Sequence, residues 1–381
     1  MTKLKLQDVA QIRAADITFG DLTVLVGAQA TGKSILLQFL KLLVDTGYVQ
    51  DELRRHGLDW SRQLPDFLNV YFGEGMESIW RTNSKVSWDG SVIDLQHLAS
   101  RMRKSHDEKL FFVPAQRVLT LRDGWPRPFT DYSPGDPFSV RNFSEELRVL
   151  MEEFSGEGSL FPRERRLKNA YRKLLQKNVF AKFKLTISKE RAQKRLVLGG
   201  RGKPLPYMVW SAGQREFVPL LLGFYWLMPP TKIARREALE WVIIEELEMG
   251  LHPRAISVVL LLILELLSRD YRVCLSTHSP QVLEMMWALT RIRKRGGTAK
   301  DVLDLFEMSS DLRPGLRHVA SRALDKRLRA YYFDRPGGRV HDISELNPAS
   351  TKRFEANWGG LSEFSEQANE VVARVSANSR D

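Results

Sequence analysis

Residues 27–34 read GAQATGKS and stand between the apolar segments LTVLV (22–26) and ILLQFLKLL (35–43). A glycine, four residues and then Gly-Lys-Ser is the spacing of a nucleotide-binding P-loop. The apolar, β-rich segment before it predicts a buried parallel strand. After Ser34, apolar residues recur at helical spacing, so bound phosphates would lie at a helix N-terminus. Strand, loop and helix together predict a P-loop in an α/β fold.

The P-loop residues have separate expected roles. Gly27 and Gly32 permit a tight turn in which backbone N–H groups surround phosphate oxygens. Lys33 supplies a positive charge to the β- and γ-phosphates, and the Ser34 hydroxyl is placed to bind Mg²⁺. We therefore expect ATP, together with Mg²⁺, to contact six loop positions: Gly27, Ala30, Thr31, Gly32, Lys33 and Ser34.

Length and composition narrow the class of protein. The chain has 381 residues, 43% hydrophobic and 27% charged, which suits one large or two ordinary globular domains. Its first residues, MTKLKLQDVA, lack the apolar region of a signal peptide. The most apolar run, residues 256–267, is too short to span a membrane and contains Glu265. A single cysteine, Cys274, fits a reducing compartment. We expect a cytoplasmic protein without a membrane partner, and a buried thiol at Cys274.

The positive charge is concentrated in one segment. The net charge is +12, and residues 161–205 contain 15 Lys or Arg against 2 Glu. Such an uncompensated field is costly in self-repulsion unless an anionic partner meets it. The segment therefore predicts a polyanion as partner, either DNA or an acidic protein that imitates it; the alternative is a solvated surface with no ligand.

Three further segments follow the P-loop in a fixed order. Ser211 in VWSAGQREF is a good N-cap for a helix with apolar residues at helical spacing. The buried strand 241–244 then delivers Glu245 and Glu246 at its carboxyl end, the edge where an open α/β sheet binds ligands. A second strand, in RVCLSTHSP, ends at His278. Each segment alone has an ordinary structural explanation, but the ordered set indicates a nucleotide site.

This ordered set resembles an ABC-type ATPase. The resemblance covers residues 1–50, 110–120 and 207–290. Within that class it is similar to the overcoming-lysogenization-defect (OLD) branch, whose members often read EEPExxLHP where residues 245–253 read EELEMGLHP. The stretch FFVPAQR (111–117) also resembles that branch's strand leading to the Q-loop.

The resemblance implies a role for each motif. Glu245 would take the Walker B metal position, and Glu246 would be the catalytic base. Gln116 would be the Q-loop contact to nucleotide and metal, and His278 the catalytic switch histidine. The signature helix start would close on the γ-phosphate held by a partner subunit, which implies a head-to-tail homodimer or a higher oligomer. Its residues are Ser211, Ala212, Gly213 and Gln214.

The chain departs from the family pattern at four positions. Glu245 stands where ABC proteins usually have Asp, and Leu247 replaces the usual proline. Glu248 occupies the place expected for the D-loop aspartate, and Gln29 stands where many relatives have asparagine. None of these changes removes a needed charge.

The expected architecture is an α/β, ABC-type P-loop ATPase core with an inserted helical and β-hairpin lobe. The expected parts are a first core segment at 1–50 and 110–120, an inserted lobe at 51–109, a basic helical and hairpin lobe at 121–206, a second core segment at 207–290 and a C-terminal helical and strand extension at 291–381.

Absent features guide the expected function. The chain shows no long coiled coil of the kind found in SMC-like repair ATPases. The acids after His278, such as Asp301, Asp304 and Glu307, follow an amphipathic helical pattern instead of forming a nuclease metal site. We expect an ATPase that acts as sensor or regulatory subunit of an antiphage defence complex and controls a separate effector nuclease. The alternatives are a DNA-binding repair or maintenance clamp and, third, a transporter nucleotide-binding subunit.

Overall fold

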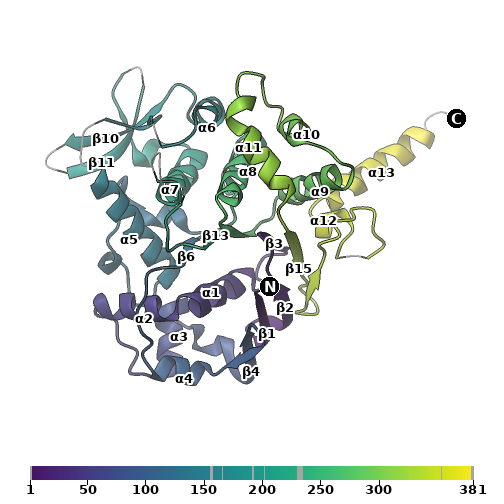
Figure 1. Ribbon diagram of the computed structural model, residues 1–381. Coiled ribbons are helices and arrows are strands. Elements are labelled where there is room, and N and C mark those ends of the chain that lie inside the picture. Colours follow the sequence, from purple (N-terminus) through teal and green to yellow (C-terminus); the bar gives the residue numbers. More distant parts are fainter. Residues whose placement is uncertain are drawn as a thin grey trace.

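A six-stranded sheet forms the centre of the computed structural model, which describes residues 2–154, 158–164, 166–190, 193–200, 202–229, 235–352 and 354–378. Its strand order is β16-β15-β3-β14-β13-β6, in which only β16 pairs antiparallel. The sheet lies between two sets of helices (Figure 1). The strands are β3 (Leu22–Gly27), β6 (Leu110–Val113), β13 (Trp241–Glu245), β14 (Arg272–Ser276), β15 (Leu328–Phe333) and β16 (Val340–Asp342).

Both faces of this sheet are buried, which explains why its strands are apolar without alternation. On β3, Leu22 and Val24 pack into one core, whereas Leu25 packs into the other. On β13, Val242 belongs to the first core and Ile243 to the second. Parallel strands covered on both faces read as continuous apolar runs. The predicted buried strands, and the buried thiol of Cys274 on β14, are confirmed.

The second core is shared by the P-loop helix and an antiparallel sheet. This sheet has the order β2-β1-β4-β5, and β4 pairs directly with β1. Residues 51–109, expected as an inserted lobe, thus supply β4 and β5 to a sheet begun by the N-terminal strands. The elements are β1 (Lys3–Val9), β2 (Ile12–Thr18), β4 (Trp80–Trp88), β5 (Ser91–Ile93), α1 (Lys33–Val44), α2 (Thr46–Arg55), α3 (Leu64–Phe72), η1 (Met76–Ile79) and α4 (Leu95–Ser100).

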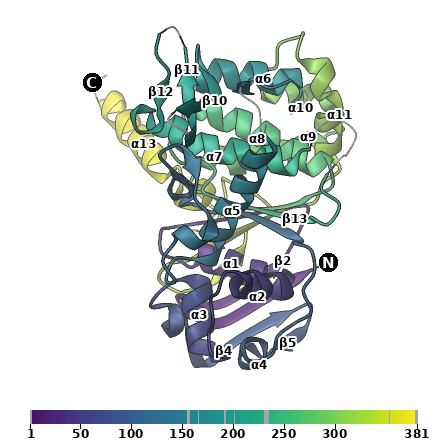
Figure 2. The same ribbon diagram turned by 90° about the vertical axis from the view of Figure 1, so that its left-hand side faces the viewer.

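Helices cover the other face of the central sheet, and a small sheet, β12-β11-β10-β9, borders them (Figure 2). Within residues 121–206, expected as a helical and hairpin lobe, β10 and β11 pair as an antiparallel hairpin. The elements are η2 (Arg117–Thr120), β7 (Leu121–Arg122), β8 (Trp125–Pro126), η3 (Phe129–Asp131), α5 (Phe138–Glu153), β9 (Gly158–Phe161), α6 (Asn169–Leu175), η4 (Gln176–Phe180), β10 (Lys184–Glu190), β11 (Gln193–Gly199), β12 (Leu205–Pro206), η5 (Tyr207–Val209), α7 (Ala212–Leu227), α8 (Pro253–Ser268), α9 (Pro280–Lys294), α10 (Ala299–Leu305) and α11 (Arg313–Leu324).

The C-terminal part contributes to the core as well as extending from it. β15 pairs in parallel with β3, so a strand more than 300 residues away in sequence lies beside the P-loop strand. The chain ends in α12 (Asn357–Gly360) and α13 (Glu363–Asn378), and α13 projects from the body (Figure 1). Among the described helices, none has both the length and the apolar content needed to cross a membrane.

Candidate nucleotide site

The P-loop connects β3 to α1 at the carboxyl edge of the central sheet. Gly27 has φ 136°, and a Cβ there would lie 2.5 Å from the carbonyl oxygen of Phe333 on β15. Gly32 has φ 95°, and a Cβ there would lie 2.7 Å from Ile12. Both positions need a left-handed backbone in a space too small for a side chain, which glycine alone satisfies. The two glycines of the motif are therefore required by the packing of β15 and β2 around the loop.

Lys33 is folded back onto its own loop. Its Nζ donates to the carbonyl oxygens of Gly27 and Ala28, both at 2.8 Å. Burial lowers the pKa of Lys33 to about 8, although the carboxylates of Glu246, Glu248 and Glu245 oppose that shift. An amine held by two carbonyls and desolvated in this way gains from a phosphate, which offers a full negative charge in their place.

Glu245 is the last residue of β13, and its side chain is buried. Its Oε2 accepts from the backbone N–H of Ala115 at 3.2 Å, and the Ser34 hydroxyl also hydrogen-bonds to the carboxylate. Burial raises the pKa of Glu245. The Oε1 atom has no hydrogen-bond partner among the described residues.

A serine hydroxyl beside an unpartnered carboxylate oxygen fits Mg²⁺. No described group of three His, Cys, Asp or Glu side chains could hold a metal alone. Mg²⁺ usually takes one or two carboxylates together with substrate phosphates and waters, so a site completed by the nucleotide agrees with both observations. Ser34 and Glu245 are the residues that would hold the ion.

Glu246 and His278 face each other across the same edge. Nε2 of His278 lies 3.7 Å from Oε1 of Glu246, and both side chains are about one-third exposed. Glu246 has φ 43°, and its backbone N–H donates to the carbonyl oxygen of Ser276 on β14. Burial, and then the charge of Lys33, lower the pKa of His278. A neutral imidazole at neutral pH is the consequence.

Glu248 holds the histidine loop in place. Its Oε2 accepts from Oγ1 of Thr277 at 2.9 Å, and its Oε1 accepts from the backbone N–H of His278. The residue expected at the D-loop aspartate position therefore fixes the loop that carries His278 within this chain. This role was not predicted from the sequence.

Arg117 connects two parts of the candidate site, and nothing in the sequence signals this contact. It is fully buried, and its guanidinium donates to the carbonyl oxygens of Glu245, Glu246 and Glu216 at 3.0, 3.1 and 3.2 Å. Its Nε also lies 3.4 Å from the Glu216 carboxylate. One arginine thus joins the carboxylate loop to the signature helix α7. Gln116, the predicted Q-loop residue, is exposed immediately before it.

The signature residues form a self-capped helix start. Ser211 is the N-cap of α7: its hydroxyl accepts from the backbone N–H of Gln214, and the Gln214 side chain accepts from the N–H of Ser211. The predicted N-cap is confirmed. Gly213 packs so closely that a Cβ would lie 2.7 Å from the carbonyl oxygen of Gly250. No hydrogen bond or ion pair between described residues connects 211–214 to the P-loop.

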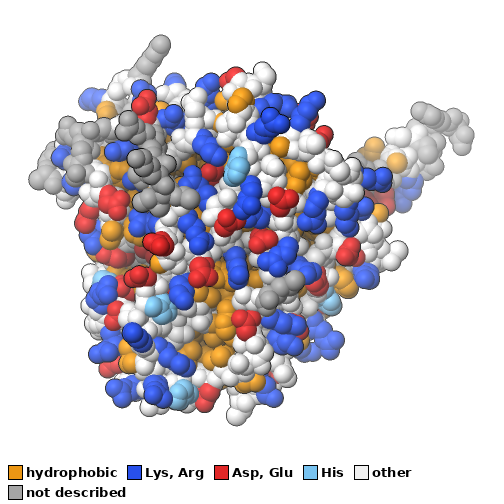
Figure 3. Space-filling model, in the orientation of Figure 1, with side chains coloured by type: hydrophobic (Ala, Val, Ile, Leu, Met, Phe, Trp, Pro, Cys, Tyr) orange, Lys and Arg blue, Asp and Glu red, His pale blue; other side chains and the backbone are white. Residues whose placement is uncertain are grey.

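The basic segment is partly neutralised inside the chain. Lys168 pairs with Glu265 at 2.7 Å, and Lys173 pairs with Asp311 at 3.0 Å. Arg166 is mostly buried and donates to the carbonyl oxygen of Tyr225 at 3.2 Å. On the face in Figure 3, Lys and Arg are spread over the surface and mixed with Asp and Glu. The count of 15 cations therefore overstates the free charge of segment 161–205; Arg165 lies outside the described residues.

The geometry agrees with a match to a known family. A family model described as "AAA domain, putative AbiEii toxin, Type IV TA system" matches residues 22–284, more than half of the chain. The match runs from the first residue of β3 into α9 and includes every candidate site residue. The chain belongs to this AAA domain family. The family is one of P-loop ATPases, so the α/β P-loop fold is confirmed. Among curated proteins, no sequence relative matches.

Solved structures of similar chain length also match this AAA domain protein. The SMC head bound to the C-winged helix domain of ScpA is 12% identical, with a TM-score of 0.41, covering 89% of this chain and 96% of that one. The SMC head domain from Thermotoga maritima is 12% identical, with a TM-score of 0.33, covering 89% and 97%. The ATP-binding cassette MJ0796 bound to ADP and Pi is 13% identical, with a TM-score of 0.34, covering 73% and 89%.

Proposed function

We propose that this protein binds ATP at the P-loop and hydrolyses it. The observation that carries the proposal is the meeting of Lys33, Ser34, Glu245, Glu246 and His278 at one edge of the sheet. Two of these side chains have a buried polar atom without a hydrogen-bond partner among the described residues: Oε1 of Glu245 and Nε2 of His278. Buried polar atoms are normally satisfied, so both point to a ligand that completes the site.

Each of these residues has a separate role in the proposed reaction. Lys33 leaves the loop carbonyls and binds the β- and γ-phosphates, where its charge offsets the charge that builds during transfer. Mg²⁺, held by Ser34 and Glu245, would supply further neutralisation of the phosphates. Glu246 accepts a proton from water as the water oxygen bonds to the γ-phosphorus and the bond to the bridging oxygen breaks, releasing ADP. His278 faces Glu246 and positions the attacked phosphate.

The signature residues act on the nucleotide of a second copy of the chain. The N-terminus of α7 carries partial positive charge and free N–H groups, which suit a γ-phosphate. Between described residues of one chain, Arg117 and Gly250 link α7 to the catalytic edge. We infer a head-to-tail homodimer in which the P-loop of each copy meets Ser211 of the other.

Mixing two inactive variants tests this arrangement. Lys33→Ala removes the phosphate-binding lysine, and Ser211→Arg places a bulky cation at the signature. Each alone should be inactive, with Ser211→Arg still binding ATP. A 1:1 mixture should recover about a quarter of wild-type ATPase activity, because half of the dimers are mixed and each mixed dimer has one intact site. Full activity of Ser211→Arg alone would contradict the shared site.

For biological role, we propose a sensor or regulatory subunit of a prokaryotic antiphage defence complex, of the OLD-like branch, acting in the cytoplasm on a separate effector nuclease. The sequence EELEMGLHP and a family description that names a toxin and a Type IV TA system support this proposal. Co-purification of a nuclease encoded beside the gene, dependent on ATP, is the expected result. Co-purification of a permease would instead favour the transporter alternative.

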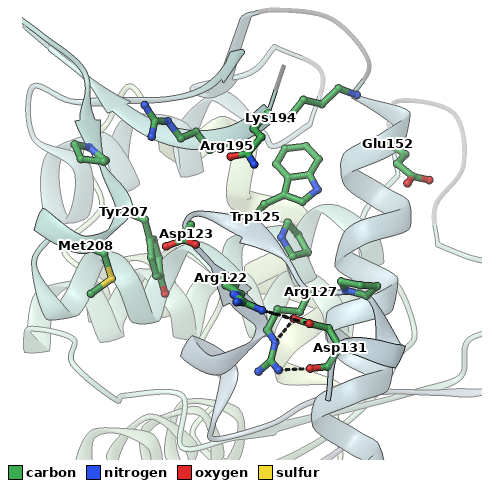
Figure 4. A pocket seen from close by; sticks show the side chains of 14 residues that line it. Arg122, Asp123, Trp125, Arg127, Asp131, Glu152, Lys194, Arg195, Tyr207 and Met208 are labelled. Carbon is green, nitrogen blue, oxygen red and sulfur yellow. Dashed lines mark hydrogen bonds and ion pairs between the residues drawn. The ribbon is translucent and has the colours of Figure 1, made fainter. Parts of the chain in front are cut away.

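A second candidate, a DNA-binding repair clamp, is favoured by the β10–β11 hairpin. Lys189 and Lys194 are directly opposite each other in the register, and like charges in such a pair destabilise a sheet unless an anion is nearby. Lys194 also lies 6.0 Å from the ring of Trp125, which lines a cavity of about 730 Å³ (Figure 4). Arginines in this cavity are already engaged, since Arg122 and Arg127 both contact Asp131. Cations on this hairpin suit the phosphate backbone of DNA.

A salt titration separates the two candidates. Lys177, Lys184 and Lys189 are exposed and form no ion pair with a described residue, so reversing them to Glu should not affect folding. Arg166 is unsuitable because its guanidinium is buried. Tight duplex binding that falls steeply with salt, and is lost in the triple variant, would favour the clamp. Negligible DNA binding at physiological salt would favour a sensor that recognises an acidic protein.

A further inference from the structure

A cavity of about 790 Å³ lies away from the nucleotide edge, between α2, α5 and the C-terminal end of α7. Its wall is strongly acidic, and Figure 3 shows acidic side chains gathered over α5 at the left of the view. The acidic residues that line it are Glu52, Asp107, Glu108, Glu145, Glu146 and Glu237. No role in the proposed ATPase reaction accounts for this cavity.

Glu146 is the buried carboxylate of the cavity. Its side chain is 6% exposed, and its Oε1 accepts from Nδ2 of Asn142 at 3.0 Å. Its Oε2 has no hydrogen-bond partner among the described residues. The Asn142 amide cannot rotate to help, because its Oδ1 accepts from the Tyr48 hydroxyl and its Nδ2 also donates to Glu108. The cluster therefore leaves Oε2 of Glu146 as a buried acceptor beside the Glu108 carboxyl.

The cluster also lacks positive charge. Lys41 is fully buried and donates to Asp45, Glu108 and the carbonyl oxygen of Leu110, which uses all three of its hydrogens. One ammonium thus faces the carboxylates of Asp45, Glu108 and Glu146. Burial and the neighbouring Glu108 raise the pKa of Glu146 as a result. A cation near Oε2 would stabilise its ionised form.

The arginines on the cavity wall are engaged elsewhere. Arg55 pairs with Asp51 and Glu52 at 3.0 and 2.6 Å. Arg236 stacks on Trp226, 3.5 Å from the ring centroid, and donates to its carbonyl oxygen. Neither guanidinium forms a hydrogen bond with Oε2 of Glu146.

We propose that this cavity binds a small organic cation, with one ammonium or guanidinium group on Oε2 of Glu146 and a second near the acidic rim. Charge-assisted N–H donors match a carboxylate that needs a hydrogen bond and a counter-charge together. The volume is within the range of small-molecule sites. A bare metal ion does not fit, because no described cluster offers three side-chain ligands.

The cavity lies between elements that continue from the two parts of the proposed nucleotide site, the P-loop and the signature. Tyr48 lies on α2, which directly follows the P-loop helix α1, and Trp226 lies near the end of α7, the helix that begins at the signature. A ligand that contacts both helices biases their relative position and so couples to nucleotide binding, with equal effect in both directions. This coupling rests on the proposed ATPase function, whereas cation binding itself does not.

Calorimetry with spermidine and agmatine as probes, in the absence of nucleotide, tests the binding. We expect one site per chain, with affinity lowered at least about tenfold by Glu146→Gln because a charge-assisted bond is lost. Glu77→Gln, an exposed acid outside the cavity, is the matched control and should bind as wild type does. Absence of binding, or equal affinity in Glu146→Gln, would overturn the proposal.

A second variant, at an exposed position, controls for the possibility that Glu146→Gln impairs folding. Glu237 is exposed on the cavity wall, so Glu237→Lys should fold normally and should also weaken spermidine binding.

The coupling is tested by measuring nucleotide affinity with and without saturating spermidine, in wild type and in Glu146→Gln. Spermidine can also associate directly with the nucleotide, and Glu146→Gln serves as the control because this direct association persists in it. A shift seen only in wild type supports the coupling, and equal shifts contradict it. If nucleotide does not bind at all, the proposed ATPase function fails while the cation result stands.

Discussion

The P-loop half and the signature half of the nucleotide site differ in how their polar atoms are satisfied. In the P-loop half, Glu245 and His278 each have a buried polar atom without a described partner, and Lys33 is held only by carbonyl oxygens. In the signature half, Ser211 and Gln214 satisfy each other in a capping box. The first half is therefore incomplete without a nucleotide, whereas the second is a stable helix start by itself. This difference agrees with a phosphate held first by one chain and contacted later by another.

The largest expected effect separates nucleotide binding, which depends on Lys33, from hydrolysis, which depends on Glu246. Glu246→Gln should lower kcat by about 10²–10⁴-fold, because the base is lost while Lys33 and the loop remain. Its affinity for ATP should stay close to that of wild type. Lys33→Ala, the matched control, should lose nucleotide binding as well as turnover. Steady-state ATPase assays and equilibrium nucleotide binding give the two readouts; hydrolysis by Glu246→Gln at the wild-type rate would place the base elsewhere.

The second effect concerns Arg117, which joins the two halves. Arg117→Met leaves three carbonyl oxygens without their donor and the Glu216 carboxylate without its ion-pair partner, and should lower the free energy of unfolding by about 3–5 kcal/mol. ATP binding should persist, because no P-loop contact is removed, but hydrolysis should fall as the signature helix loses its link. The control is Arg122→Met, whose exposed pair with Asp131 should contribute at most about 1 kcal/mol. Equal urea unfolding curves for the two variants would show that Arg117 does not join the halves.

The smallest effect is a pH dependence confined to the P-loop half. The pKa of Lys33 is lowered to about 8 by burial. Below this pH the amine is already charged and ATP affinity should be flat. Above it, binding must take up a proton, so affinity should fall by about tenfold per pH unit. Lys33→Arg, which keeps its charge, should flatten the curve. A wild-type affinity that is constant through this pH range would contradict the lowered pKa.

The local features of the site were predictable from the sequence. The spacing of Gly27, Gly32 and Lys33, the apolar strands and the N-cap at Ser211 are short-range patterns, and the structure has them at the expected residues. A residue's neighbours along the chain determine turns, caps and the period of burial. The order of the motifs was sufficient to predict the central sheet and its ligand-binding edge.

The contacts that join these features were not predictable from local pattern. A buried arginine is an exception to the usual surface position of charge, so nothing near Arg117 in sequence signals that it is fully buried. Charge counting in segment 161–205 could not reveal Glu265 and Asp311 as partners, because each lies about a hundred residues or more away.

The sequence by itself therefore determined the class of fold, the P-loop and the residues that we propose carry the chemistry. Only the tertiary structure decided that β15 encloses Gly27, that Arg117 joins the carboxylates to α7, and that an acidic cavity lies beside Glu146. The physical reason is the distance along the chain over which each kind of interaction acts. Helix periodicity and turn chemistry act over a few residues, whereas burial, pairing of charges and unsatisfied acceptors depend on which distant segments the folded chain brings into contact.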